Sequence, residues 1–295
     1  MTSGASPRRP AALVLGVCLV AAACTPGRVT GVLERLSPAP PTPAAIGPPP
    51  ECAPIPVLFR FRFAPETTVE DRDLLRTTMR QARDYFPLRH PTAARYSYVE
   101  ERYRCYPERY VEPVTTTEEP PPDERVAEYG RGEGPRFYIT ARTWLLIPAE
   151  HKAAIMFHEA YHWFQWLAQS RAPSGQRWDT DLPHWLQEGS AEWAGFEAAV
   201  HFGLYPSMEA ARAYHARYQG LALTELRKHG RHIGPSFEAY SLFFFAADEL
   251  ATERGGRLAM RRYWQDQRDD EWEVRFRRIF GLSPKAFYLD FEATD

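Results

Sequence analysis

The sequence is poor in cysteine and nearly balanced in charge. Four cysteines stand in 295 residues, too few for the dense disulfide framework of a small secreted scaffold. The 36 basic and 38 acidic residues nearly cancel, which argues against a nucleic-acid-binding protein and against attraction to an acidic membrane surface. Internal repeats are absent. Hydrophobic residues make up 44% of the chain, enough to bury one substantial core.

A long hydrophobic run is also missing, because the apolar stretch from Ala11 to Ala23 is too short to span a bilayer comfortably. The stretch follows Arg8 and Arg9, an order typical of a secretory signal peptide, which we place at residues 1–23. It ends in small residues that lead directly into Cys24. This ending resembles the lipobox of bacterial lipoproteins, so we expect an exported cell-envelope lipoprotein lipidated at Cys24. A plain signal peptide and ordinary secretion are the alternative.

The segment after the lipobox is expected to be a tether, at residues 24–56. Nine of the nineteen residues from Pro38 to Pro56 are proline, a composition that favours extended conformations and builds no core. Cys52 and Cys105 then remain for the folded part. Because an even pair in an oxidising compartment favours a bond, we expect a disulfide between them, with two unrelated thiols as the alternative.

The folded domain is expected at residues 57–295, with strands first and helices after them. Alternation and helical spacing predict a strand at 57–63, a helix at 67–85, strand within 94–114, a loop at 115–134 and a short strand at 137–140. The pattern becomes helical at Pro148 and stays so to the end. We therefore predict an α+β domain, with a strand and helix part at residues 57–147 and a mainly helical part at residues 148–295.

Two features of the helical part have competing interpretations. Six of the eight tryptophans lie between Trp144 and Trp193, and they favour a core around the neighbouring helices over an aromatic cleft for apolar or carbohydrate groups. The charged residues 257–278 predict one helix with a solvated face, which ends at Phe280-Gly281.

A histidine and glutamate motif lies in the middle of a helix predicted at residues 150–170. The motif is His158-Glu159-Ala160-Tyr161-His162, the H-E-x-x-H pattern. Residues four apart stand on one helix face, so both imidazoles can reach one zinc while Glu159 leans over the open side of the metal. The continuation to a third histidine is absent, which excludes the three-histidine class. Two histidines satisfied within the core are the alternative.

A glutamate on the next predicted helix completes a ligand set. Asp181 and Pro183 suit the start of a helix that carries Trp185-Leu186-Gln187-Glu188-Gly189. Two histidines and one glutamate leave a fourth zinc position for water, the arrangement of a catalytic site. The H-E-A-Y-H and W-L-Q-E-G-S-A-E segments together resemble the gluzincin metallopeptidases, the group that contains thermolysin and the zinc aminopeptidases.

The resemblance covers Phe137 to the C-terminus and implies a zincin-like fold that binds one Zn²⁺. It implies that the metal ligands are His158, His162 and Glu188 and that Glu159 is the general base. Glu192 stands where thermolysin-like enzymes carry an acid that hydrogen-bonds a zinc histidine, and a solvated helix carboxylate is the alternative for it.

Further residues are weaker candidates for the site. His184 is a rival metal ligand, and Glu197 is a less well placed counterpart of Glu192. A later tyrosine or histidine supplies an oxyanion donor in several gluzincins, which implies Tyr240, with His232 in reserve. A helix is expected to start at Pro235, and Tyr240 in its first turns can also be interpreted as core.

The intact set of base and ligands favours a zinc endopeptidase of the cell envelope. Its partners are then a polypeptide substrate and, through the N-terminal lipid alone, a membrane. The G-x-M-E-N segment with which zinc aminopeptidases hold a substrate amino terminus is absent, which argues against that exopeptidase activity. The alternatives are a non-catalytic gluzincin-like lipoprotein that binds a partner and a zinc amidohydrolase acting on a non-peptide envelope substrate.

Overall fold

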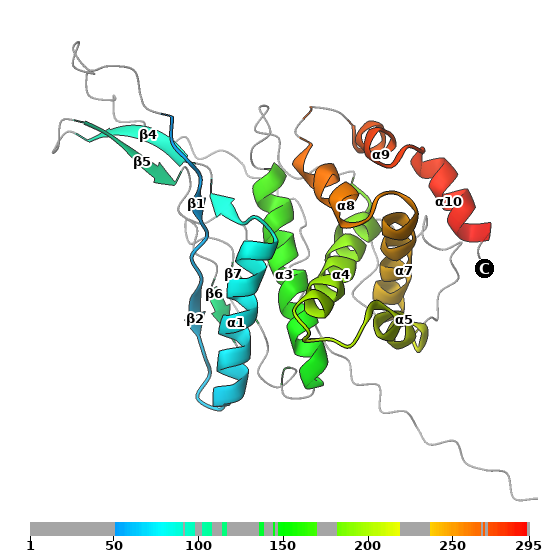
Figure 1. The fold of residues 1–295 in the computed structure, drawn as a ribbon, viewed down its shortest axis with the longest axis horizontal. Coiled ribbons are helices and arrows are strands. Elements are labelled where there is room, and N and C mark those ends of the chain that lie inside the picture. Colours follow the sequence, from blue (N-terminus) through cyan, green and yellow to red (C-terminus); the bar gives the residue numbers. More distant parts are fainter. Residues whose placement is uncertain are drawn as a thin grey trace, which may run out of the picture.

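A computed structural model describes the folded part of the chain (Figure 1). The described residues are 51–90, 92–97, 102–107, 114–116, 136–138, 144, 147–169, 182–218, 237–266, 268 and 271–293. They are mainly helical, and the expected helical half is present, while the strands are short and belong to the N-terminal part. The predictions for residues 1–50, Cys24 included, and that for His232 lie outside the described residues. The N-cap prediction for Asp181 is wrong, because the N-cap of the helix that carries Glu188 is Pro183.

The strands of the described chain form three small sheets. They are β1 (Ile55–Pro56), β2 (Arg60–Arg62), β3 (Arg89–His90), β4 (Thr92–Ser97), β5 (Arg102–Pro107), β6 (Val114–Thr116) and β7 (Arg136–Tyr138). β1 pairs with β3 and β4 pairs with β5, both antiparallel, whereas β2, β6 and β7 are parallel. The strand predicted at 57–63 is confirmed only at β2, because residues 57–59 are not strand and Val57 lies buried between β1 and β2, where its N–H donates to Leu88 O. The loop predicted at 115–134 likewise begins with strand residues of β6.

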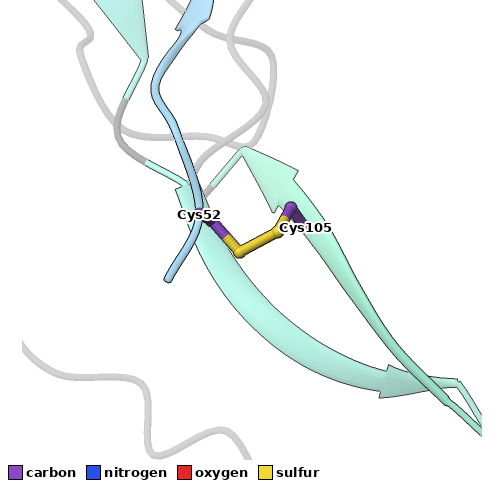
Figure 2. Close-up of a disulfide and its surroundings, with 2 residues drawn as sticks. All are labelled: Cys52 and Cys105. Carbon is purple, nitrogen blue, oxygen red and sulfur yellow. A yellow bond between two sulfur atoms is a disulfide. The ribbon is translucent and has the colours of Figure 1, made fainter. Parts of the chain in front are cut away.

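A disulfide joins Cys52 to Cys105 (Figure 2), the pairing expected from the sequence. Cys52 precedes β1, and Cys105 lies in β5 opposite Ala94 of β4. The bond therefore fastens the end of the proline-rich segment to the β4–β5 hairpin. The segment predicted as a tether to residue 56 ends sooner, because the fold already includes Cys52 and β1.

The helices carry most of the core. They are α1 (Val69–Tyr85), α3 (Ala149–Gln169), α4 (His184–His201), α5 (Met208–Ala216), α7 (Phe237–Glu253), α8 (Gly256–Gln265), α9 (Trp272–Phe280) and α10 (Pro284–Ala293). No helix in the described part of the chain is long and apolar enough to cross a membrane.

The single charged helix predicted at 257–278 is wrong, because two helices occupy that stretch. Asp266 ends α8, and its carboxylate accepts hydrogen bonds from Arg268 and Arg278, which stabilises the break. The stretch is not simply a solvated face either. Tyr263 and Phe276 are fully buried, so each helix presents an apolar side to the core.

Helix α4 lies between α3 and α7 in the helical layer (Figure 1). Two glycines allow these helices to approach closely. A Cβ atom at Gly195 would lie 2.6 Å from Ala154 O of α3, and a Cβ atom at Gly189 would lie 2.3 Å from Phe243 O of α7. Any side chain at either position would force the helices apart. The two glycines therefore set the depth at which α4 is buried.

Helix α1 packs against the other side of α3 through fully buried Leu75 and Met79. A buried ion pair reinforces this contact, because Lys152 Nζ donates to Asp71 Oδ1 at 2.8 Å. The tryptophans of the described segment belong to the core, as the favoured interpretation predicted, since Trp144, Trp163, Trp185 and Trp193 are all buried and Trp166 is half-buried.

Candidate metal centre

The two histidines of the motif lie one turn apart on α3, where this helix meets α4. The close approach at Gly195 brings the backbone of α4 against His158, because a Cβ atom there would lie 3.0 Å from His158 N. Glu188 lies on the same helix, two turns earlier, and is 2% exposed. The sequence therefore buries a carboxylate beside two imidazoles, a combination that is costly unless the groups are paired or hold a cation.

Three donor atoms of these residues form a nearly regular triangle. His158 Nε2 lies 3.0 Å from His162 Nε2, and Glu188 Oε2 lies 3.5 Å from the first nitrogen and 3.3 Å from the second. Tetrahedral zinc, with bonds of about 2.0–2.1 Å, places its donor atoms about 3.3 Å apart. The three residues form the group of described side chains that could hold a metal ion. The triangle fits zinc in size and in donor type.

The pKa values in the metal-free site reflect this proximity. Burial alone would raise the pKa of the Glu188 carboxyl, but the charge of His162 and hydrogen bonds from both motif histidines hold it well below its ordinary value. Burial likewise opposes charge on His158, but contacts with Glu188 and Glu192 raise its pKa well above the ordinary value. Protons on the imidazoles thus balance the carboxylates, and a bound cation would displace those protons.

The outer nitrogen of His158 is held by a carboxylate. Glu192 Oε2 lies 2.7 Å from His158 Nδ1, the side of the ring that faces away from the triangle. Such a partner keeps a proton on Nδ1 and leaves the Nε2 lone pair for a metal. Glu192 is therefore not a solvated helix carboxylate but lies against the ring of His158, a predicted zinc ligand.

The outer nitrogen of His162 is held by Gln165, which sequence reasoning missed. Gln165 Oε1 lies 2.8 Å from His162 Nδ1, and Gln165 Nε2 donates to Gln187 O and to Ser190 Oγ, both at 3.0 Å. A backbone carbonyl can only accept, so the amide nitrogen must face Gln187 and the amide oxygen must face His162. Nδ1 of His162 is then the donor, and its Nε2 is free for a metal.

Glu159 and Tyr240 flank the triangle. Burial raises the pKa of the partly exposed Glu159 carboxyl, and the charges of Glu188 and Glu192 raise it further against the opposing imidazoles. The Tyr240 hydroxyl donates to Glu188 Oε2 at 3.3 Å, and its ring lies 6.1 Å from that of His158. Burial and the nearby carboxylates raise the pKa of Tyr240 well above its ordinary value, so the phenol keeps its proton.

The remaining sequence candidates stand apart from the triangle. His184 Nε2 lies 3.5 Å from Glu188 Oε1, the oxygen that does not belong to the triangle, and its side chain is 30% exposed. Glu197 points to the opposite end of α4, where it accepts a hydrogen bond from Tyr85 and pairs with Arg257. Its role as a second counterpart of Glu192 is therefore wrong.

Comparison of the chain with protein-family models, with curated proteins and with solved structures gives no match.

Proposed function

We propose that this chain is a zinc-dependent hydrolase, in the simplest case an endopeptidase, with a zincin-like catalytic domain of the gluzincin type. The observation that carries the proposal is the triangle of His158 Nε2, His162 Nε2 and Glu188 Oε2, with sides of 3.0, 3.3 and 3.5 Å. The outer contacts of both imidazoles support it, since each holds a proton on Nδ1 and leaves Nε2 as the nitrogen that can bind a metal once its own proton is displaced.

Zinc held by these three residues would supply a Lewis acid and would lower the pKa of a coordinated water to about 7. Glu159 is the proton carrier, because it stands between the ligands on α3 and its raised pKa suits a group that takes up a proton and gives it back. It accepts a proton from the attacking water and returns it to the leaving amine. Tyr240 keeps its proton and donates a hydrogen bond to the substrate carbonyl oxygen as negative charge develops there.

A polypeptide substrate at the cell envelope follows from the features of the sequence. The gluzincin pattern favours cleavage of an amide bond, and the predicted signal peptide and lipobox at Cys24 favour an exported lipoprotein. A zinc amidohydrolase of a non-peptide envelope substrate would use the same residues.

The test is a Glu159→Gln variant of the full-length chain, compared with the parent for zinc content and for hydrolysis of an unfolded protein. Both proteins should hold one zinc per chain. The variant should lose hydrolysis by about 10²–10⁴-fold, because only proton transfer is removed. Glu197→Gln is the matched control, since it makes the same change on α4 away from the triangle.

Parent protein without zinc, or undiminished hydrolysis by Glu159→Gln, would contradict the proposal. Stoichiometric zinc without hydrolysis of any peptide or envelope amide would instead favour a lipoprotein that binds a partner.

A further inference from the structure

Glu192, which contacts His158, also contacts a buried histidine on another helix. While Glu192 Oε2 faces His158, its second oxygen, Oε1, lies 3.5 Å from Nε2 of His215. His215 comes from α5, a short helix that begins after the N-cap Ser207 and packs on α7. It is 2% exposed, so this imidazole is a polar group inside the core.

The position of the His215 ring is determined by its neighbours. The ring stacks on Phe244 of α7, with centroids 4.0 Å apart and planes 16° from parallel. Nδ1 lies 3.2 Å from Ser241 Oγ. Within the described part of the chain, the buried Nε2 atom makes no hydrogen bond of ordinary geometry, and Glu192 Oε1, at 3.5 Å, is the carboxylate oxygen beside it. The ring is thus held by α7 with one nitrogen directed at the carboxylate.

The protonation of His215 follows from this arrangement. Burial lowers its pKa to about 4, despite the opposing charge of Glu192, so the ring is neutral at pH 7 and carries one N–H. A carboxylate can only accept, so the proton belongs on Nε2, and Nδ1 accepts from the Ser241 hydroxyl. The resulting chain runs from Ser241 through His215 and Glu192 to His158 and joins α7, α5, α4 and α3.

We propose that His215 is a positioning residue for the metal centre, which orients the Glu192 carboxylate and through it the ligand His158. The proposal rests on the proposed function, because it assumes that His158 holds zinc. Without the N–H of His215, Glu192 Oε1 is buried with one fewer partner, and the carboxylate can turn away from His158. Groups that orient a metal ligand are known to influence metal affinity strongly, and His215 acts one contact further out.

Three substitutions in the full-length chain distinguish the contribution of Nε2 of His215 from that of Nδ1. His215→Phe keeps the stacking on Phe244 and removes both polar contacts. His215→Gln keeps a donor in the place of Nε2, whereas His215→Asn keeps a polar atom in the place of Nδ1 only. The control is His151→Phe, which removes a partly buried imidazole that also lies among aromatic rings and whose partner is the Tyr205 hydroxyl.

Zinc affinity is measured by competition with a chromophoric chelator, and the visible spectrum of the cobalt(II) form reports the geometry of the site. The Phe and Asn variants should bind zinc about tenfold more weakly than the parent, the lower end of the effect of groups that contact a ligand directly. Their cobalt spectra should also change. The Gln variant and the control should match the parent in both readouts.

Parent-like zinc affinity and cobalt spectrum in the Phe and Asn variants would overturn the inference, and so would an equal loss in the Gln variant, which would indicate packing rather than orientation. Either outcome leaves the proposed function intact. A parent protein that binds no zinc would overturn the proposed function itself, and this inference with it.

Discussion

The N-terminal part and the helical half of this molecule are held together by different means. The first consists of short strands, a disulfide between Cys52 and Cys105, and α1, which joins the rest through buried apolar side chains and a buried ion pair. The second is a layer of helices whose central member, α4, approaches both neighbours closely at glycines. The side chains of the candidate site all belong to the second part.

This difference indicates a division of roles. The residues that hold and orient the proposed metal depend on the packing of α3, α4, α5 and α7, whereas the disulfide joins β5 to the residues before β1. Changes in the N-terminal part should therefore alter stability without altering the metal site. Changes on α4 should alter the site more strongly the closer they lie to the triangle.

The largest expected effect is on stability, from the double substitution Cys52→Ser with Cys105→Ser. The bond closes a loop with a sequence separation of 53 residues, so its loss should lower the free energy of unfolding by about 4 kcal/mol on the chain-entropy model. Denaturant unfolding measures this change. Zinc content should remain that of the parent, because both cysteines belong to the N-terminal part and neither supplies a donor atom to the triangle.

Zinc loss from the double variant while it remains folded would contradict the division of roles. It would also reopen the assignment of the ligands.

The second effect is the loss of a ligand from the helical half. Glu188→Ala should weaken zinc binding by at least about 100-fold, or roughly 2.7 kcal/mol, the upper end of what removal of an orienting partner costs. Chelator competition measures it. Glu197→Ala, on the same helix but paired with Tyr85 and Arg257, should keep parent affinity. Equal zinc binding by the two variants would contradict the ligand set.

The parts of the site that were predictable from sequence are residues whose spacing along a single helix indicates that they share a face. His158, Glu159 and His162 share one helix, and Glu192 is one turn after Glu188, so helical spacing alone places them. Gln165 has the same kind of signal, since it follows His162 by three residues on α3. Sequence reasoning missed Gln165 because glutamine is not among the residue types that usually bind zinc.

Other features depend on contacts between distant segments. His215 and Ser241 meet Glu192 only after α5 and α7 have packed, and nothing in their local sequence indicates it. The break between α8 and α9 contains no proline or glycine and is stabilised by arginine contacts to Asp266. The parallel pairing of β2, β6 and β7 likewise joins residues that are far apart in the chain.

The smallest expected effect concerns the contact of α4 with α7. Gly189 follows the proposed ligand Glu188, and a Cβ atom there would lie 2.3 Å from the carbonyl oxygen of Phe243. A methyl group must therefore move α7 away, since a backbone oxygen cannot rotate aside. Tyr240 is on α7 and donates to Glu188 across this contact. The substitution should thus disturb the tyrosine more than the histidines of α3.

Gly189→Ala should lower the free energy of unfolding by about 2 kcal/mol, measured by denaturant unfolding. It should reduce hydrolysis while zinc affinity changes little, because the three ligands lie on α3 and α4. The control is Gly203→Ala, which has open space around the added carbon but a φ of +69°. That variant should lower the free energy of unfolding by about 1 kcal/mol, because alanine disfavours this backbone conformation, and it should keep full hydrolysis. If both variants lost hydrolysis equally, the loss would follow stability in general, and the contact of α4 with α7 would have no separate part in placing Tyr240.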